Sequence, residues 1–293
     1  MTNWYKEKKM KGNLIKTLFI LLITLPVCSA PVVDFSLQNV AKELGLHRET
    51  EGGPACAFDY NRDGRKDLLV CNYRKEINLY QHNPDGTFSN VSDEVGLTDI
   101  VKKFGHSFWL TPFDGDADGY TDLVGGSDPG IGDPNGIIVF LKNVDGREFI
   151  DSSNKVKGID INMTTKTDIA DLNNDGLLDI ILIDVYGVNK FLGRIFLNSG
   201  NLKFDDVTDQ SGIDFSQTKS VLIVDYNRDS MQDIFQSTLG DGLRLYQNRG
   251  NAKFVNVTKL AGIQEKGLSY GAHPGDINND GLLDIVASND QKG

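Results

Sequence analysis

The sequence predicts an all-β protein, a β-propeller of four-stranded antiparallel blades, and two observations predict it. A nine-residue pattern, Asp-x-[Asp/Asn]-x-Asp-[Gly/Ser]-x-x-Asp, occurs five times, and successive copies start 55, 57, 54 and 51 residues apart. Short apolar runs bounded by turn residues recur at fixed places around each copy. Near-constant spacing of this kind indicates an array of one structural unit, with about five units present.

The apolar runs read as strands because they are short, rich in β-branched and aromatic residues, and enclosed by turn residues. One run precedes the pattern, as at 55–58 and 221–224, and a second follows it, as at 67–70, 179–182 and 233–235. A third run comes next, at 77–80, 137–140, 194–197 and 243–246, and ends in a turn that contains Asn and Gly. A Phe-x-x-Val segment followed by Gly-Leu or Gly-Ile closes the unit, as at 88–91, 204–207 and 254–257. Four strands in each unit are typical of a propeller blade.

The first strand of each unit is expected to lie innermost, because small residues such as Ala55, Ala57 and Ala170 precede the patterns and suit a crowded axis. No long segment with a 3.6-residue period is evident after residue 30, which argues against a helical solenoid.

The two ends of the repeat array leave the number of blades open. Residues 35–46 resemble a fourth, outer strand with no blade before it, and the fifth unit has only two strands before Gly293. One interpretation is a five-bladed ring that closes imperfectly, and the other is the N-terminal portion of a longer propeller. We favour the second, so residues 31–293 are predicted to form one propeller domain that is incomplete at its C-terminus.

Residues 1–30 are predicted to be a secretory signal peptide. Five lysines between residues 6 and 16 precede an apolar run, Leu18–Val27, which is too short for a comfortable membrane span. The alternatives are an uncleaved anchor and a lipoprotein modified at Cys28, but Val27 is bulky for a residue before a lipidated cysteine. The protein is therefore expected to be secreted, periplasmic or at the cell surface, with no stable membrane span after cleavage.

The net charge of −11 argues against binding to nucleic acid through a basic face. Sixteen aspartates are concentrated in the five patterns, three in four of them and four in the second. Carboxylates packed so closely repel one another unless a cation lies among them.

Each pattern is predicted to be a loop that binds Ca²⁺, which prefers six to eight oxygen ligands. Positions 1, 3, 5 and 9 offer side-chain oxygens, and position 7 offers a backbone carbonyl. The predicted ligands are Asp59, Asn61, Asp63, Arg65 and Asp67 in the first loop; Asp114, Asp116, Asp118, Tyr120 and Asp122 in the second; Asp171, Asn173, Asp175, Leu177 and Asp179 in the third; Asp225, Asn227, Asp229, Met231 and Asp233 in the fourth; and Asp276, Asn278, Asp280, Leu282 and Asp284 in the fifth. Up to five calcium ions are expected, one for each loop.

Position 6 of the loop requires a tight turn, which Gly permits because it tolerates positive φ. The fourth loop has Ser230 there, so it is expected to be the weakest site. An EF-hand is excluded because position 12 holds no chelating carboxylate and strand-like residues follow. The remaining alternative, a turn rich in Asp and Asn that holds no metal, is less consistent with five copies.

Cys56 and Cys71 flank the first loop. If this segment is a hairpin in an exported protein, the two residues lie on neighbouring strands and a disulfide between them is plausible. The alternative is a pair of small buried apolar residues.

The repeats resemble the FG-GAP/VCBS family, the repeat of integrin α-subunit propellers and of many exported bacterial proteins. The resemblance rests on the calcium-loop pattern, on Leu-Tyr-x-Asn, and on the stretch from Asn248-x-Gly250 through Phe254-Val-Asn-Val-Thr258 to Ala261-Gly-Ile263. That stretch is especially similar to bacterial proteins carrying a terminal ASPIC/UnbV domain. The resemblance implies a calcium-stabilised ring of seven blades, whereas this chain has five loops.

The function expected from the sequence is that of an exported calcium-binding module for binding, adhesion or scaffolding. Its partner would be a protein or a glycan, bound by the variable loops 126–136 and 184–193 on the face opposite the metal loops, with Tyr186 and Phe191 as candidate contacts. No catalytic motif is recognisable, so an enzyme is not expected. The alternative is an extracellular enzyme acting on polysaccharides, or a non-catalytic part of one.

Overall fold

The computed structural model describes residues 38–46, 53–71, 76–104, 108–127, 137–159, 166–184, 192–263 and 267–290. The chain divides into a short unit, residues 1–39, and a compact unit, residues 40–293, and the account below concerns the second. The predicted signal peptide and the partner-face candidates Tyr186 and Phe191 lie outside the described residues. Among those that are described, no helix has the length and apolar character needed to cross a membrane.

The predicted all-β architecture is confirmed, and four successive antiparallel blades are complete. The first blade contains β1 (Ala55–Phe58), β2 (Asp67–Cys71), β3 (Ile77–His82) and β4 (Phe88–Asn90). The second contains β5 (Phe108–Phe113), β6 (Asp122–Ser127), β7 (Ile138–Val144) and β8 (Glu148–Asp151). The third contains β9 (Lys166–Ala170), β10 (Asp179–Asp184), β11 (Leu192–Asn198) and β12 (Phe204–Asp206). The fourth contains β13 (Thr218–Val224), β14 (Asp233–Gly240), β15 (Leu243–Asn248) and β16 (Phe254–Asn256), and a fifth unit begins with β17 (Gly267–Gly275) and β18 (Asp284–Asp290).

The blades stack face to face, because each hydrophobic cluster takes residues from two successive units. One cluster joins Leu79 of the first blade to Leu141 of the second, and another joins Phe140 to Phe204, whose ring centroids are 5.8 Å apart. The third and fourth blades share a cluster that includes Tyr246, and Ile285 of β18 packs against the fourth blade. Middle strands such as β10 are therefore apolar on both faces, which explains their unbroken runs of Ile and Leu.

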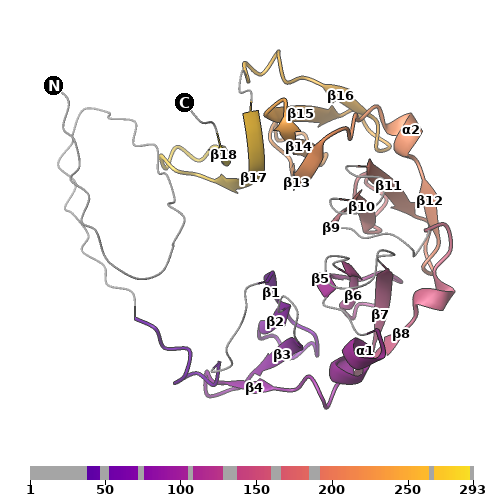
Figure 1. The fold of residues 1–293 in the computed structure, drawn as a ribbon, viewed down its shortest axis with the longest axis vertical. Helices are drawn as coiled ribbons and strands as arrows, with labels where there is room; N and C mark the ends of the chain where they lie inside the picture. The colour runs from indigo at the N-terminus through magenta and orange to yellow at the C-terminus, as the bar shows by residue number, and fades with distance from the viewer. Residues whose placement is uncertain are drawn as a thin grey trace. The chain divides into compact units, whose positions relative to one another are not determined.

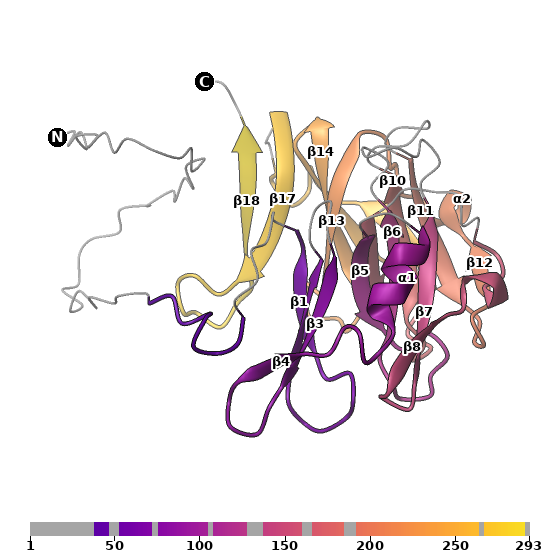
Figure 2. The ribbon, with the colours of Figure 1, turned by 60° about the horizontal axis from the view of Figure 1, so that its bottom comes forward.

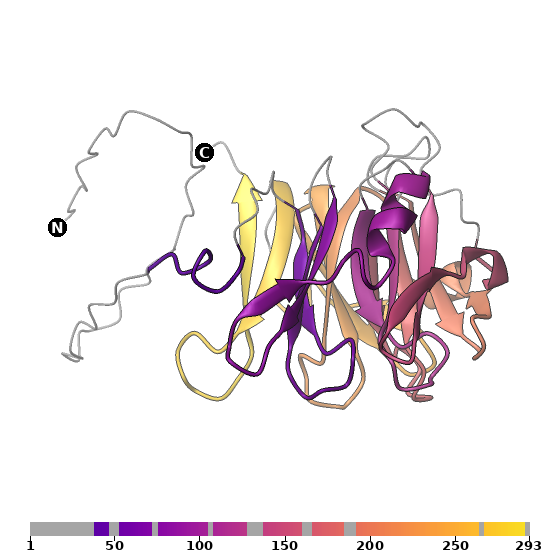
Figure 3. The same ribbon diagram turned by 90° about the horizontal axis from the view of Figure 1, so that it is seen from below.

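The first strand of each unit lies innermost, as predicted. Contacts link β1 to β5, β5 to β9, β9 to β13 and β13 to β17. Figure 1 shows the sheets following one another along an arc with these strands on its inner side. The loops that join first to second strands project from one edge of the sheets (Figure 2, Figure 3). Ring closure and the number of blades in a complete ring stay predictions.

Two features differ from the expected arrangement of strands and links in a blade. The link after the first blade forms a helix, α1 (Leu97–Phe104), which buries Leu97 and Ile100. In the described parts of the next two links the helical segments are shorter, at Ser153–Lys155 and in α2 (Thr208–Ser211). In addition, β17 pairs with the far end of β14, so the fourth and fifth units share one sheet.

The disulfide between Cys56 and Cys71 is not present, and both thiols are free. Cys56 is opposite Leu69 in the β1–β2 ladder, while Cys71 lies two residues further along and its N–H donates to Pro54. The two cysteines are therefore diagonal rather than opposite neighbours. Burial raises the pKa of Cys56 to about 11 and that of Cys71 to about 12, as expected for two small buried apolar residues.

Candidate metal centre

The five predicted loops each connect the first and second strands of a unit and share one backbone conformation. The aspartate at position 1 accepts hydrogen bonds from the N–H groups at positions 5 and 6. In the first loop, Asp63 N lies 3.1 Å from Asp59 Oδ1 and Gly64 N lies 2.8 Å from Asp59 Oδ2. The same pair recurs at Asp114, Asp171, Asp225 and Asp276. A carboxylate at position 1 thus closes the turn.

The tight turn predicted at position 6 is confirmed, since all five residues there have positive φ. Four are glycines, and Ser230 of the fourth loop adopts φ 67° while keeping its hydrogen bond to Asp225. Position 4 is also left-handed in every loop, which the sequence analysis missed. These residues are Arg62, Ala117, Asn174, Arg228 and Asn279. Asn in two of them is the only local signal, because Asn tolerates this conformation.

The aspartate at position 9 has a second role, which the sequence analysis did not assign. Asp179 is fully buried and accepts hydrogen bonds from Leu172 N and Asn198 N, both at 2.8 Å. It therefore ties the loop to the end of the third strand of its own blade. The equivalent aspartates of the first, second and fourth loops, Asp67, Asp122 and Asp233, do the same.

Burial raises the pKa of these aspartates, since desolvation outweighs the backbone hydrogen bonds. The pKa reaches about 6 for Asp122, Asp179 and Asp233. Without a metal ion, ionisation of these buried aspartates thus costs free energy, and a nearby cation would reduce that cost.

Positions 3 and 5 are linked by their side chains in four of the loops. The amide nitrogen of Asn227 donates to Asp229 Oδ2 at 2.8 Å, and Asn61, Asn173 and Asn278 make the same bond. The carboxylate at position 5 also accepts the N–H of position 7 through its other oxygen, as Asp175 does from Leu177 at 2.8 Å. Carbonyl ligation by Arg65, Tyr120, Leu177, Met231 and Leu282 stays a prediction.

The donor set fits a hard divalent cation. Ligand oxygens of Asp225, Asp229 and Asp233, at positions 1, 5 and 9, lie within 4.8 Å of one another, and so do those of Asp114, Asp116 and Asp118. Asp116 Oδ1 is buried without a hydrogen-bond partner. Several carboxylate oxygens converging without a soft ligand among them match the preference of Ca²⁺.

An asparagine near the end of the third strand joins the second, third and fourth loops each to the loop of the preceding blade. Asn198 Nδ2 donates to Gly115 O of the second loop at 3.1 Å and to Leu178 O of its own loop at 3.2 Å. Asn143 and Asn248 repeat this arrangement. The sequence analysis used these asparagines only as turn markers, although their recurrence before Gly was visible.

The face opposite the metal loops is described only in part. Trp109 and Lys166 lie near the starts of β5 and β9, at the far ends from the loops, and Lys166 Nζ lies 5.3 Å from the centroid of the Trp109 ring. Both side chains are half-buried.

Comparisons with known proteins agree with this repeat architecture. Residues 59–125, 171–236 and 225–287 match a family model described as FG-GAP-like repeat, and together these stretches cover more than half of the chain. Cartilage acidic protein 1 of Xenopus tropicalis is 30% identical over 91 residues, which make up 31% of this chain and 14% of that protein. A solved structure of an Agrocybe aegerita lectin that recognises non-reducing terminal N-acetylglucosamine superposes with a TM-score of 0.51 at 19% identity, covering 80% of this chain and 60% of the lectin. That likeness concerns the fold alone.

Proposed function

The chain belongs to the FG-GAP-like repeat family, and on that premise we propose that it is a calcium-stabilised propeller acting as a binding module outside the cytoplasm. The observation that carries the proposal is the fivefold recurrence of one loop in which a position 1 carboxylate closes the turn and position 9 anchors it. Calcium would neutralise the carboxylates that burial and crowding otherwise penalise.

Calcium would act as a folding ligand, because the converging oxygens exist only in the folded loop. A cation that binds only the native state stabilises it by about 1.4 kcal/mol per loop when its free concentration is about ten times the dissociation constant. Sites in extracellular modules bind with dissociation constants of about 0.1–1 mM, which suits an exported protein.

Thermal unfolding of the full chain in excess chelator, in millimolar Ca²⁺ and in millimolar Mg²⁺ tests the calcium proposal. Ca²⁺ should raise the melting temperature well above the other two conditions. Asp229→Asn, which weakens the fourth loop, should reduce this shift, while Asp93→Asn, an exposed aspartate outside the loops, should leave it unchanged. A melting temperature that does not respond to Ca²⁺ would show that the loops are turns without metal.

The binding surface is proposed to be the face opposite the metal loops. Support comes from Trp109 and Lys166, an aromatic ring and a cation placed together at that end of the inner strands. Aromatic rings that remain partly exposed are favoured contacts for proteins and for sugar rings. The partner is proposed to be a protein or a glycan, and we propose no catalytic role.

A glycan array probed with the calcium-loaded protein, alongside a binding screen against candidate proteins, tests this surface. Replacement of Tyr186 and Phe191 by Ala should weaken the binding of any ligand without lowering the melting temperature, and Trp109→Ala should weaken ligand binding as well. Leu260→Ala changes an exposed apolar residue elsewhere and serves as the control. Ligand binding that survives all the changes on this face would place the site elsewhere.

A further inference from the structure

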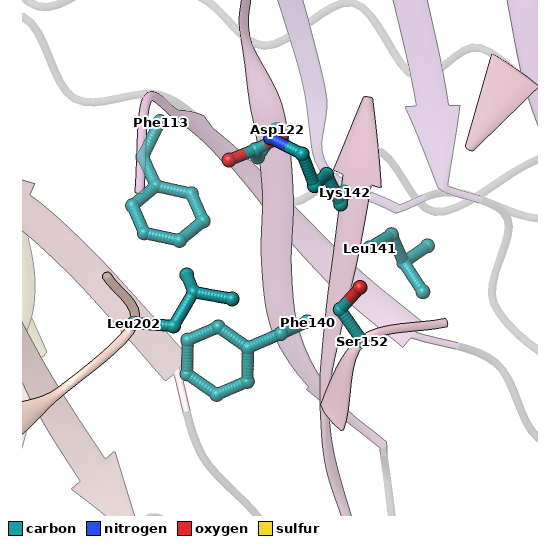
Figure 4. A pocket seen from close by; sticks show the side chains of 7 residues that line it. All are labelled: Phe113, Asp122, Phe140, Leu141, Lys142, Ser152 and Leu202. Atoms are coloured by element: carbon teal, nitrogen blue, oxygen red, sulfur yellow. The ribbon is translucent and has the colours of Figure 1, made fainter. Parts of the chain in front are cut away.

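The second loop differs from the others because a lysine from the third strand reaches into it. Lys142 Nζ forms ion pairs with Asp116 and Asp118, and the contact to Asp118 Oδ2 is 2.7 Å. Lys142 and Asp122, at position 9 of the same loop, both line the small pocket drawn in Figure 4. The side chain of Lys142 is 24% exposed, so the ammonium is largely enclosed by the loop.

The carboxylates around Lys142 all raise the pKa of its ammonium group. Burial lowers the pKa of this ammonium, but hydrogen bonds to Asp116 and Asp118 and the charge of Asp122 outweigh burial and raise it above its usual value. Lys142 therefore pairs with two of the four carboxylates in the loop, Asp116 and Asp118.

In the sibling loops a neutral group donates where Lys142 does, although in the first loop the guanidinium of Arg65 also pairs with Asp63 at position 5. Their position 3 is Asn, whose amide nitrogen donates to the carboxylate at position 5. In the second loop Asp116 cannot donate, and the ammonium supplies that hydrogen bond instead. Lys142 stands one residue before Asn143, and the matching residues of the first, third and fourth blades are Gln81, Leu197 and Gln247, none of them charged.

We infer that Lys142 is a built-in cation of the second loop, which stays free of calcium at concentrations that fill the sibling loops. This rests on the proposed calcium function and lowers the expected number of ions from five to four. Calcium could enter the loop only if the ammonium first gave up both ion pairs. We therefore expect the second loop to bind at least tenfold more weakly than its siblings, which replaces the expectation that the fourth loop is the weakest site.

Net charge alone would not distinguish the second loop. Four carboxylates and one ammonium sum to −3, which equals the charge of the third and fifth loops. What differs is position, since the ammonium binds one oxygen of Asp116 and one of Asp118, at positions 3 and 5, where a cation would need ligands, and leaves Asp116 Oδ1 without a partner.

Equilibrium dialysis of the full chain with radioactive Ca²⁺ tests this by counting bound ions. The wild type is compared with Lys142→Gln and with the double variant Lys142→Gln/Asp116→Asn, which recreates the residue pairs of the first and fourth loops. Both variants should bind one more ion than the wild type. Lys103→Gln breaks an ion pair with Asp151 outside the loops, at 2.7 Å, and should leave the number unchanged.

Equal, non-zero numbers of ions in the wild type and the variants would overturn the inference and leave the proposed function standing. No bound ions in any of these proteins would overturn both. The double variant is expected to fold, because the same combination of Gln and Asn already occurs in the folded first and fourth loops. If neither variant folds, the wild type decides by itself: four bound ions support the inference and five overturn it.

Discussion

The side-chain amide of Asn198 donates a hydrogen bond to the backbone carbonyl of Gly115, which lies 83 residues earlier in the metal loop of the preceding blade. Its backbone N–H binds Asp179, and its side-chain oxygen accepts the N–H of Gly200. One buried residue therefore connects two loops, a strand and a turn. The same contact is repeated at Asn143 and Asn248, so a hydrogen bond links each of these neighbouring pairs of metal loops.

Replacing Asn198 by Ala should destabilise the protein by about 2–4 kcal/mol, because two buried carbonyls lose their donor and a small cavity remains. Urea unfolding in saturating Ca²⁺ measures the change. Asn154→Ala, at an exposed position, is the control and should change the unfolding free energy by less than about 0.5 kcal/mol. An Asn198→Ala variant as stable as this control would mean that the contact between blades contributes nothing.

Gly158→Ala should be among the most damaging substitutions in the links between blades. Its φ is +91°, and a Cβ there would lie 1.7 Å from the backbone oxygen of Phe204 in the next blade. The expected loss is about 3 kcal/mol, from left-handed strain and forced separation of the blades. Gly262 occupies the same Gly-Ile motif with φ +74° but has nothing within 4 Å, so Gly262→Ala should cost only about 1 kcal/mol. Chemical unfolding of both variants measures the difference, and equal losses would contradict the steric argument.

Ser230→Gly should stabilise the protein by about 0.5–1 kcal/mol, because glycine removes the strain of φ 67° at position 6 of the fourth loop. Thermal unfolding in chelator isolates this effect from calcium binding. Ser216 is exposed and lacks positive φ, so Ser216→Gly should have the opposite sign through the added entropy of the unfolded chain. If both variants were destabilised, backbone strain in the fourth loop would not be the explanation.

Asp168 on the innermost strand β9 should make stability fall as pH rises. Desolvation raises the pKa of this carboxyl to about 6, although the charge of Lys166 opposes the shift. The folded protein therefore holds a proton that the unfolded chain has already lost, and the stability that this proton supplies disappears between about pH 4 and pH 6.

Asp168→Asn should remove this dependence. Above pH 6 the variant is expected to be more stable than the wild type by about 1–2 kcal/mol, a reduced figure because the side chain is partly exposed. Urea unfolding at several pH values in saturating Ca²⁺ measures the difference, and the two stability curves should converge near pH 4. If the unfolding free energies of the wild type and the variant differed by the same amount at every pH in this range, ionisation of Asp168 would not be the cause of the difference.

Local sequence signals predicted the strands and loops because those elements are specified by neighbouring residues. The apolar run Ile180–Leu182 follows a turn and lies within β10. The turn at Gly176 required positive φ, which the structure contains. The helix α1 was missed because its eight residues, although amphipathic, are shorter than the stretch over which a helical period can be recognised.

The sequence by itself determined the repeat, the four-stranded blade and the acidic loop, because each depends on residues within a few positions of one another. Tertiary structure decided which distant groups meet. Asn198 reaches Gly115 across 83 residues, and Lys142 reaches Asp116 across 26. Such contacts depend on how blades stack and on which side of a strand a side chain emerges, and a motif of nine residues specifies neither.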